Sequence, residues 1–147
     1  MSRIALLTVG VTCFALLLEV VAAPGLKEPP NDLKKLQGDW TIESWVQVGQ
    51  AVQMQATWTF KSDKYTLDMA GNREEGNIKL DKQKKHPTID LAITEGTCQG
   101  KDQPGIYKLD GDTLTLCFSW PGVADRPTDF ASTADNRWIL ITLKRKK

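Results

Sequence analysis

Few residues of this chain could carry out chemistry, and none of them stands in a catalytic pattern. The only histidine, His86, precedes Pro87 in a lysine-rich stretch. A general base needs an orienting partner and a nearby nucleophile or water, and the neighbouring sequence offers neither. One histidine also excludes a multi-histidine metal site. We therefore predict that His86 is a solvated loop residue.

Acidic side chains provide the second set of candidates. Two aspartates flank Gly111, but the ligand spacing of a calcium loop does not follow them, and a hairpin turn explains both. Paired carboxylates could flank a glycosidic bond if they met in a cleft; the pairs in question are Glu74 with Glu75 and Asp90 with Glu95. Such acids usually lie exposed on the outer face of strands. We therefore expect a protein that is not an enzyme, with no catalytic residue, no metal site and no cofactor.

The overall charge argues against one class of partner. Lys plus Arg number 19 and Asp plus Glu number 18, which gives a formal net charge of +1 over 147 residues. A sequence-independent nucleic-acid binder needs a basic field that this balance does not supply. We expect no nucleic-acid partner.

The N-terminal segment has the layout of a secretory signal peptide. Arg3 precedes an uncharged apolar run over 4–18, and the small residues Ala22 and Ala23 follow. A permanent transmembrane helix needs about 20 apolar residues, which this run does not reach. The pattern predicts a cleaved signal peptide over 1–23, export to the periplasm, the cell envelope or the medium, and no stable membrane span after cleavage. An uncleaved anchor is the alternative.

Cleavage would remove one of the three cysteines. Cys13 lies inside the apolar run, so Cys98 and Cys117 would be the remaining thiols. Disulfides persist in exported proteins, and a bridge between these two is therefore possible. The alternative is that they remain free, because a buried thiol packs as a small hydrophobe.

From Trp40 onward, apolar and polar residues alternate with a period of two. The first run places Trp40, Ile42 and Ser44 on one face and Trp45 on the other. Turn signals separate the runs at hairpin spacing. Eight such runs predict eight short strands, over 40–48, 52–60, 65–69, 76–80, 89–93, 107–109, 114–118 and 139–143.

Eight strands with one apolar face each must close on themselves to cover that face and their edges. We predict an all-β fold: an antiparallel up-and-down barrel over 36–147, preceded by a linker and short helical turn over 24–35. One long connection, over 119–136, has two prolines and no periodicity, which is typical of a functional loop. We expect it to shape the mouth of the barrel through Trp120, Arg126 and Phe130.

Several segments carry a family resemblance. The stretch 36–40 (Leu-Gln-Gly-Asp-Trp) resembles the Gly-x-Trp opening of lipocalins, and further matching segments lie at 88–91, 105–118, 126–130 and 143–145. Together they resemble a small exported lipocalin-like domain family of planctomycete bacteria. The resemblance implies a barrel and export, and no established activity. It also implies that a basic residue near the last strand, Arg145 or Arg137, packs across Trp40.

The inward face is the candidate ligand site. An eight-stranded barrel is either filled by side chains or holds one small ligand. We predict a non-enzymatic barrel that binds a small apolar or amphipathic molecule. The alternatives are a cell-envelope interaction module with a filled core and a surface formed by Trp45 and Trp120, or a carboxylate hydrolase. The predicted lining residues are Trp40, Met54, Trp58, Phe60, Tyr65, Leu67, Met69, Leu91, Leu116 and Phe118, with Ile141.

Overall fold

A computed structural model describes residues 31–82 and 84–147 of the chain. The predicted signal peptide, 1–23, and most of the predicted linker lie outside the described residues. Within 31–82 and 84–147, no helix has the length and apolar character that a membrane span requires.

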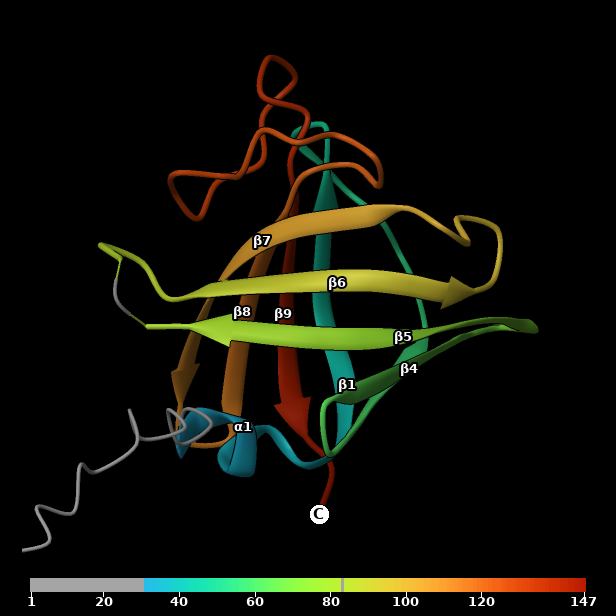
Figure 1. Ribbon diagram of the computed structural model, residues 1–147. Helices are drawn as coiled ribbons and strands as arrows, with labels where there is room; N and C mark the ends of the chain where they lie inside the picture. Colours follow the sequence, from blue (N-terminus) through green and yellow to red (C-terminus); the bar gives the residue numbers. More distant parts are fainter. Residues whose placement is uncertain (1–30, 83) are drawn as a thin grey trace, which may run out of the picture.

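The elements follow the predicted order closely (Figure 1). All eight predicted strands are confirmed, and a two-residue strand is added after the first. The elements are α1 (Asn31–Leu36), β1 (Gly38–Gln47), β2 (Gln50–Ala51), β3 (Ala56–Lys61), β4 (Lys64–Met69), β5 (Asn72–Asp81), β6 (Thr88–Glu95), β7 (Asp102–Asp110), β8 (Thr113–Phe118) and β9 (Ile139–Arg145).

The strands form a closed antiparallel barrel. Each strand from β3 to β9 pairs with the next, and β1 joins both ends of the series because Trp40 pairs with Trp58 of β3 and with Arg145 of β9. The short β2 pairs only with the end of β1 and stands outside this circle. In Figure 1, β5, β6 and β7 cross in front of β1, β8 and β9, so the two groups of strands cover each other's apolar faces. The predicted eight-stranded up-and-down barrel is confirmed.

Close packing inside the barrel depends on two glycines, Gly76 and Gly105. Gly105 of β7 pairs with Phe118 of β8. A Cβ atom at Gly105 would lie 2.3 Å from Cδ1 of Phe118 and 2.8 Å from the carbonyl oxygen of Cys117. Only glycine therefore lets the Phe118 ring lie this close to β7.

A β-bulge in β1 overturns one prediction. The register of β1 against β9 shifts between Ile42 and Ser44, and beyond the shift Trp45 pairs with Ile141. Because Ile141 is a core residue, Trp45 packs against the core as well. The prediction that Trp45 lies on the outer face is wrong, since one inserted residue reverses the alternation for the rest of the strand.

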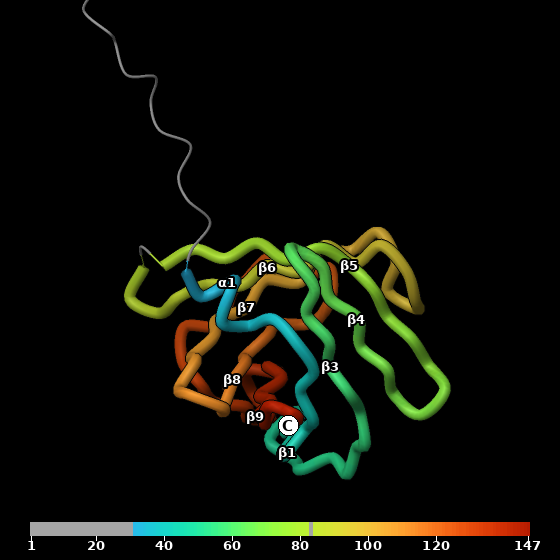
Figure 2. The backbone as a smooth tube through the Cα atoms, turned by 90° about the horizontal axis from the view of Figure 1, so that it is seen from below, coloured from blue at the N-terminus to red at the C-terminus, as the bar shows by residue number. Residues whose placement is uncertain are grey.

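Helix α1 and the C-terminal strand close one end of the barrel, the end seen in Figure 2. The Trp40 indole donates a hydrogen bond from Nε1 to the Leu36 carbonyl oxygen at 2.8 Å. The Arg145 guanidinium carbon lies 4.2 Å from the centre of the Trp40 ring, and its nitrogens donate to the carbonyl oxygens of Gln37 and Lys35. Of the two arginines that the resemblance suggested for this position, the structure places Arg145 there. The opposite end carries the β1–β2 turn and the connection 119–138 (Figure 1).

Candidate functional site

Aromatic side chains fill the centre of the barrel. The Trp58 ring stacks with Phe60 and with Phe118, each at a centroid distance of 6.0 Å, and tilts against Tyr65 at 5.8 Å. The larger hollows of the described residues open on the surface, and none is lined by Trp58, Phe60 or Phe118. Of the predicted lining residues, only Leu91 and Tyr65 border these hollows.

Most of the predicted lining residues form the core instead. Met69 packs against the core and is half-buried, whereas Met54 lies between β2 and β3, outside any strand. The remaining residues are buried in one cluster: Trp40, Trp58, Phe60, Tyr65, Leu67, Leu91, Leu116 and Phe118, with Ile141.

The Glu74 side chain faces the core. Glu74 of β5 pairs with Leu67, and its carboxylate accepts a hydrogen bond from the Tyr65 hydroxyl at 2.9 Å. Burial raises the pKa of Glu74, and the Tyr65 hydrogen bond opposes this by favouring the charged form. Burial and the negative charge of Glu74 raise the pKa of Tyr65. The sequence held the signal for this position, because the alternation through Gly76 and Ile78 extends back to residue 74.

The acidic pairs considered from sequence do not converge. Glu74 faces the core, while Glu75 forms an ion pair with Arg73 at 2.6 Å on the outer face. Asp90 is held by Arg126 at 2.6 Å. These contacts give no support to a carboxylate hydrolase. In the described part of the chain, no three His, Cys, Asp or Glu side chains group closely enough to hold a metal ion.

The long connection packs partly outside the barrel. Arg126 donates to the carbonyl oxygen of Gly105 at 2.8 Å as well as to Asp90. Phe130 meets His86 edge to face, with ring centroids 5.3 Å apart. His86 is half-buried, whereas a fully solvated residue was predicted. Arg126 and Phe130 therefore fix the connection to the outer face of the sheet. Of the three residues predicted to shape the mouth, only Trp120 lies there.

The open end carries a hollow of about 890 Å³ between the β1–β2 turn and the connection 119–138; we call it the mouth hollow. It contains all three large apolar side chains that the described residues expose: Val48 (36%), Trp120 (42%) and Val123 (45%). Exposed apolar groups gathered in one hollow mark a binding site more often than scattered ones. The lining residues are Val48, Ser119, Trp120, Val123, Asp125, Ala134, Asn136, Arg137 and Trp138.

Hydrogen bonds tie one wall of the mouth hollow to the barrel. The Gly49 N–H donates to Oγ of Ser132, and that hydroxyl donates to the Trp138 carbonyl oxygen at 2.6 Å. The Asn136 side-chain oxygen accepts from the N–H groups of Thr133 and Trp138. Two turns far apart in the sequence are thus locked together.

The opposite wall is fixed in the same way. The Val123 N–H donates to the Trp120 carbonyl oxygen at 3.0 Å, which closes a turn. The Gly122 N–H donates to the carbonyl oxygen of Asp102 in β7 at 2.8 Å. A ligand would therefore meet a site that is already formed, which lowers the ordering cost of binding.

Backbone strain presents Val48 to the mouth hollow. Val48 and Gly49 form a two-residue turn between the paired residues Gln47 and Gln50, with φ of 53° and 74°. A β-branched residue in the left-handed region is a genuine outlier, and Asn or Gly is the usual choice there. The strained position carries an exposed apolar side chain where a polar one would fit better. Such strain is concentrated at functional sites.

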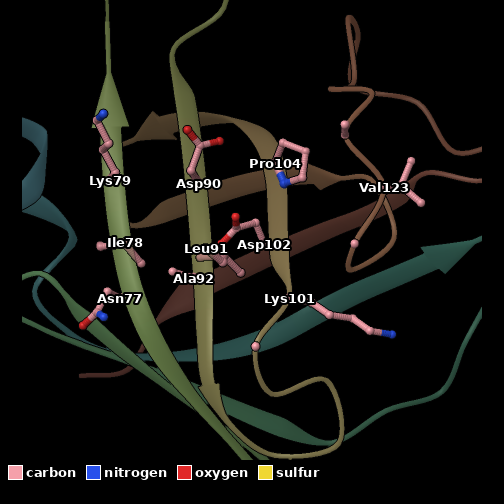
Figure 3. Close-up of a pocket in the computed structure, with 13 residues that line it drawn as sticks. Asn77, Ile78, Lys79, Asp90, Leu91, Ala92, Lys101, Asp102, Pro104 and Val123 are labelled. Atoms are coloured by element: carbon pink, nitrogen blue, oxygen red, sulfur yellow. The ribbon is translucent and has the colours of Figure 1, made fainter.

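A second hollow, of about 610 Å³, lies on the outer face of β5, β6 and β7 (Figure 3). Lys79 and Asp90 rise from neighbouring strands, and Val123 borders the hollow from the connection 119–138. Asp90 is already neutralised by Arg126. Because Val123 is its one exposed large apolar side chain, this hollow is a weaker candidate than the mouth hollow.

Both described cysteines are free thiols. Cys117 is fully buried, and its Sγ lies 3.6 Å from the Ala131 carbonyl oxygen in the connection 119–138. Burial raises the pKa of Cys117 to about 11. Cys98 lies instead in the β6–β7 connection, near Tyr65. The possible bridge is not formed, and the alternative of a packed thiol describes Cys117.

The comparisons with known proteins add no relative: no protein-family model, curated protein or solved structure matches this chain. The candidate site therefore rests on the geometry of the mouth hollow. Sequence inspection identified Trp120 but missed Val48 and Trp138. Val48 was missed because the first predicted strand, 40–48, includes it, whereas β1 ends at Gln47.

Proposed function

We propose that this protein is an exported, non-enzymatic barrel that binds a small amphipathic molecule in the mouth hollow. The observation that carries the proposal is the gathering there of every large apolar side chain that the described residues expose. The hollow has the volume of a small-molecule site, and polar groups border its apolar wall. The strained Val48 adds an apolar contact at a position where folding alone favours another residue.

The packed interior of the barrel favours the mouth hollow as the ligand site. Trp58, Phe60 and Phe118 occupy the centre, and a ligand there would have to displace packed rings. The mouth hollow needs no such displacement, because its walls are bonded in place.

Export and family membership belong to the same proposal. The layout of 1–23 supports secretion, and the segments noted above support membership of the lipocalin-like family of planctomycete bacteria. The Arg145 contact with Trp40 agrees with the arrangement that this resemblance implies.

A second candidate is a cell-envelope interaction module, which the filled core and the exposed Trp120 favour. Trp45 does not belong to that surface, because it packs against the core. Both candidates use Trp120, so the size of the ligand separates them.

NMR signals of the tryptophan indole N–H groups test this proposal. The chain has five tryptophans, and ¹⁵N-labelled protein should show one indole signal for each. Titration with octyl glucoside, octanoate and octylphosphocholine, each below its micelle concentration, should shift the signals of Trp120 and Trp138. The Trp40 indole, bonded inside the closed end, is the internal control.

Three outcomes decide between the alternatives. Shifts confined to Trp120 and Trp138 support the proposal. Shifts centred on Trp58 would place the ligand in the interior and overturn the choice of site. If no amphiphile shifts any signal, while a Trp120→Ala variant loses a partner captured from envelope extract, the interaction module replaces the proposal.

A further inference from the structure

Two opposite charges stand free in the mouth hollow. The described residues include four arginines, of which Arg73, Arg126 and Arg145 each form an ion pair. Arg137 is exposed and, within 31–82 and 84–147, its side chain makes no hydrogen bond or ion pair. The exposed carboxylate of Asp125 has no such partner there either. Arg137 and Asp125 line the same hollow but form no ion pair with each other.

Hydrogen bonds hold the backbone at Arg137 in place. Arg137 has a φ of 54°, and its N–H donates to the Thr133 carbonyl oxygen at 3.2 Å. Asn136, which precedes it, is bonded through both its N–H and its side chain to Thr133. A guanidinium on a rigid turn with no protein partner is well suited to a phosphate or carboxylate, because its donors match two oxygens at once.

The same hollow suits a cation as well. Trp120 and Trp138 supply two indole rings, and indoles attract alkylammonium groups through their electron-rich faces. The Asp125 carboxylate lines the same hollow. A ligand with a single charge would use only one of the two free protein charges.

We infer that the mouth hollow recognises a zwitterionic amphiphile, whose quaternary ammonium group lies among Trp120, Trp138 and Asp125 and whose phosphate or carboxylate lies against Arg137. This inference rests on the proposed function and names its ligand class. A short apolar chain on the ligand would contact Val48 and Val123. The proposed occupant is a single dispersed molecule, because the hollow of about 890 Å³ has the volume of a small-molecule site.

The test compares head groups on one octyl chain. Octylphosphocholine, octyl glucoside, octyl sulfate and octyltrimethylammonium are titrated below their micelle concentrations, with the Trp120 and Trp138 indole signals as readout. Octylphosphocholine should bind at least about fivefold more tightly than each of the others, since only it uses both charges. Asp125→Asn and Arg137→Gln should each weaken its binding about two- to fivefold and leave octyl glucoside unchanged.

Matched variants control for general charge effects. Asp135→Asn removes an exposed acid from the same connection but outside the hollow, and Lys34→Gln removes a cation from α1 at the other end. Both should leave every affinity unchanged.

The outcomes separate this inference from the proposed function. Equal affinity for all four head groups, with shifts still confined to Trp120 and Trp138, overturns the zwitterion and leaves the proposed function standing. No shift with any amphiphile overturns both. Sedimentation of the protein with phosphatidylcholine vesicles, without binding of dispersed octylphosphocholine, overturns the single-molecule inference in favour of a membrane surface.

Discussion

Replacing Val48 with Asn should make the protein more stable and a weaker binder at the same time. Val48 holds a φ of 53° in the β1–β2 turn. Left-handed backbone costs a residue with a Cβ roughly 1–2 kcal/mol, and a β-branched side chain fits worst, whereas Asn tolerates it. Val48→Asn should therefore raise the free energy of unfolding by about 1 kcal/mol, or the melting temperature by about 3–5 °C for a domain of this size.

The affinity of Val48→Asn for amphiphiles should fall, although its stability rises. Val48 is 36% exposed, and that part of its side chain is what a ligand could cover. Burying a whole Val side chain is worth about 1.5–3 kcal/mol, so covering this part contributes about 0.5–1 kcal/mol. The variant should bind octyl-chain amphiphiles about two- to fivefold more weakly.

The β4–β5 turn provides a matched control. Ala70 and Gly71 form a turn of the same length, with φ of 40° and 100°, and Ala70 does not line the mouth hollow. Ala70→Asn should also stabilise the fold, with no change in affinity. Urea denaturation measures the first effect and indole titration the second. If Val48→Asn lowers stability, the strain argument fails; if its affinity matches the wild type, Val48 is no part of the binding wall.

Three shorter predictions concern the rest of the barrel. Arg145→Ala should lower the free energy of unfolding by about 2 kcal/mol, because it removes a cation–π contact and charge-assisted hydrogen bonds. The control Lys144→Ala should change the free energy of unfolding by less than about 0.5 kcal/mol, with both values measured by urea denaturation. Glu74 has a raised pKa in the folded state, so its contribution to stability is greatest at acidic pH and is lost as the pH rises through that pKa; Glu74→Gln should flatten this decline in melting temperature. Reductant should leave the melting temperature unchanged, and iodoacetamide at pH 8 should modify Cys98 while Cys117 reacts only in denaturant, as mass spectrometry would show.

Alternation made the barrel predictable, and a bulge shows where alternation fails. Each run of apolar residues with a period of two became a strand, and antiparallel closure follows from covering the apolar faces. In β1, the extra residue near Glu43 follows no glycine or proline, so nothing in the sequence marks it. The prediction for Trp45 therefore failed although the strand itself was correct.

The mouth hollow could be predicted only in part, because it joins distant segments. The β1–β2 turn meets the connection 119–138 through Gly49 and Ser132, which are 83 residues apart. A Cβ at Gly49 would lie 3.2 Å from the Ala134 nitrogen, so the two turns approach each other closely. No local pattern encodes that approach. Trp120 was identifiable because it stands in an aperiodic loop, whereas Trp138, just before the last strand, was not.

The filled interior and the strained mouth are physically connected. Alternation shows which side chains face inward but not whether they leave room, and here Gly105 admits the Phe118 ring that completes the central stack. A barrel stabilised by such a packed core tolerates a turn strained by about 1–2 kcal/mol at its rim. Removing the core aromatics to open an interior cavity would lower that tolerance, since a Phe or Trp to Ala change costs about 3–5 kcal/mol. In this chain the packed centre therefore provides the rigidity, and the mouth hollow at the open end remains available for a ligand.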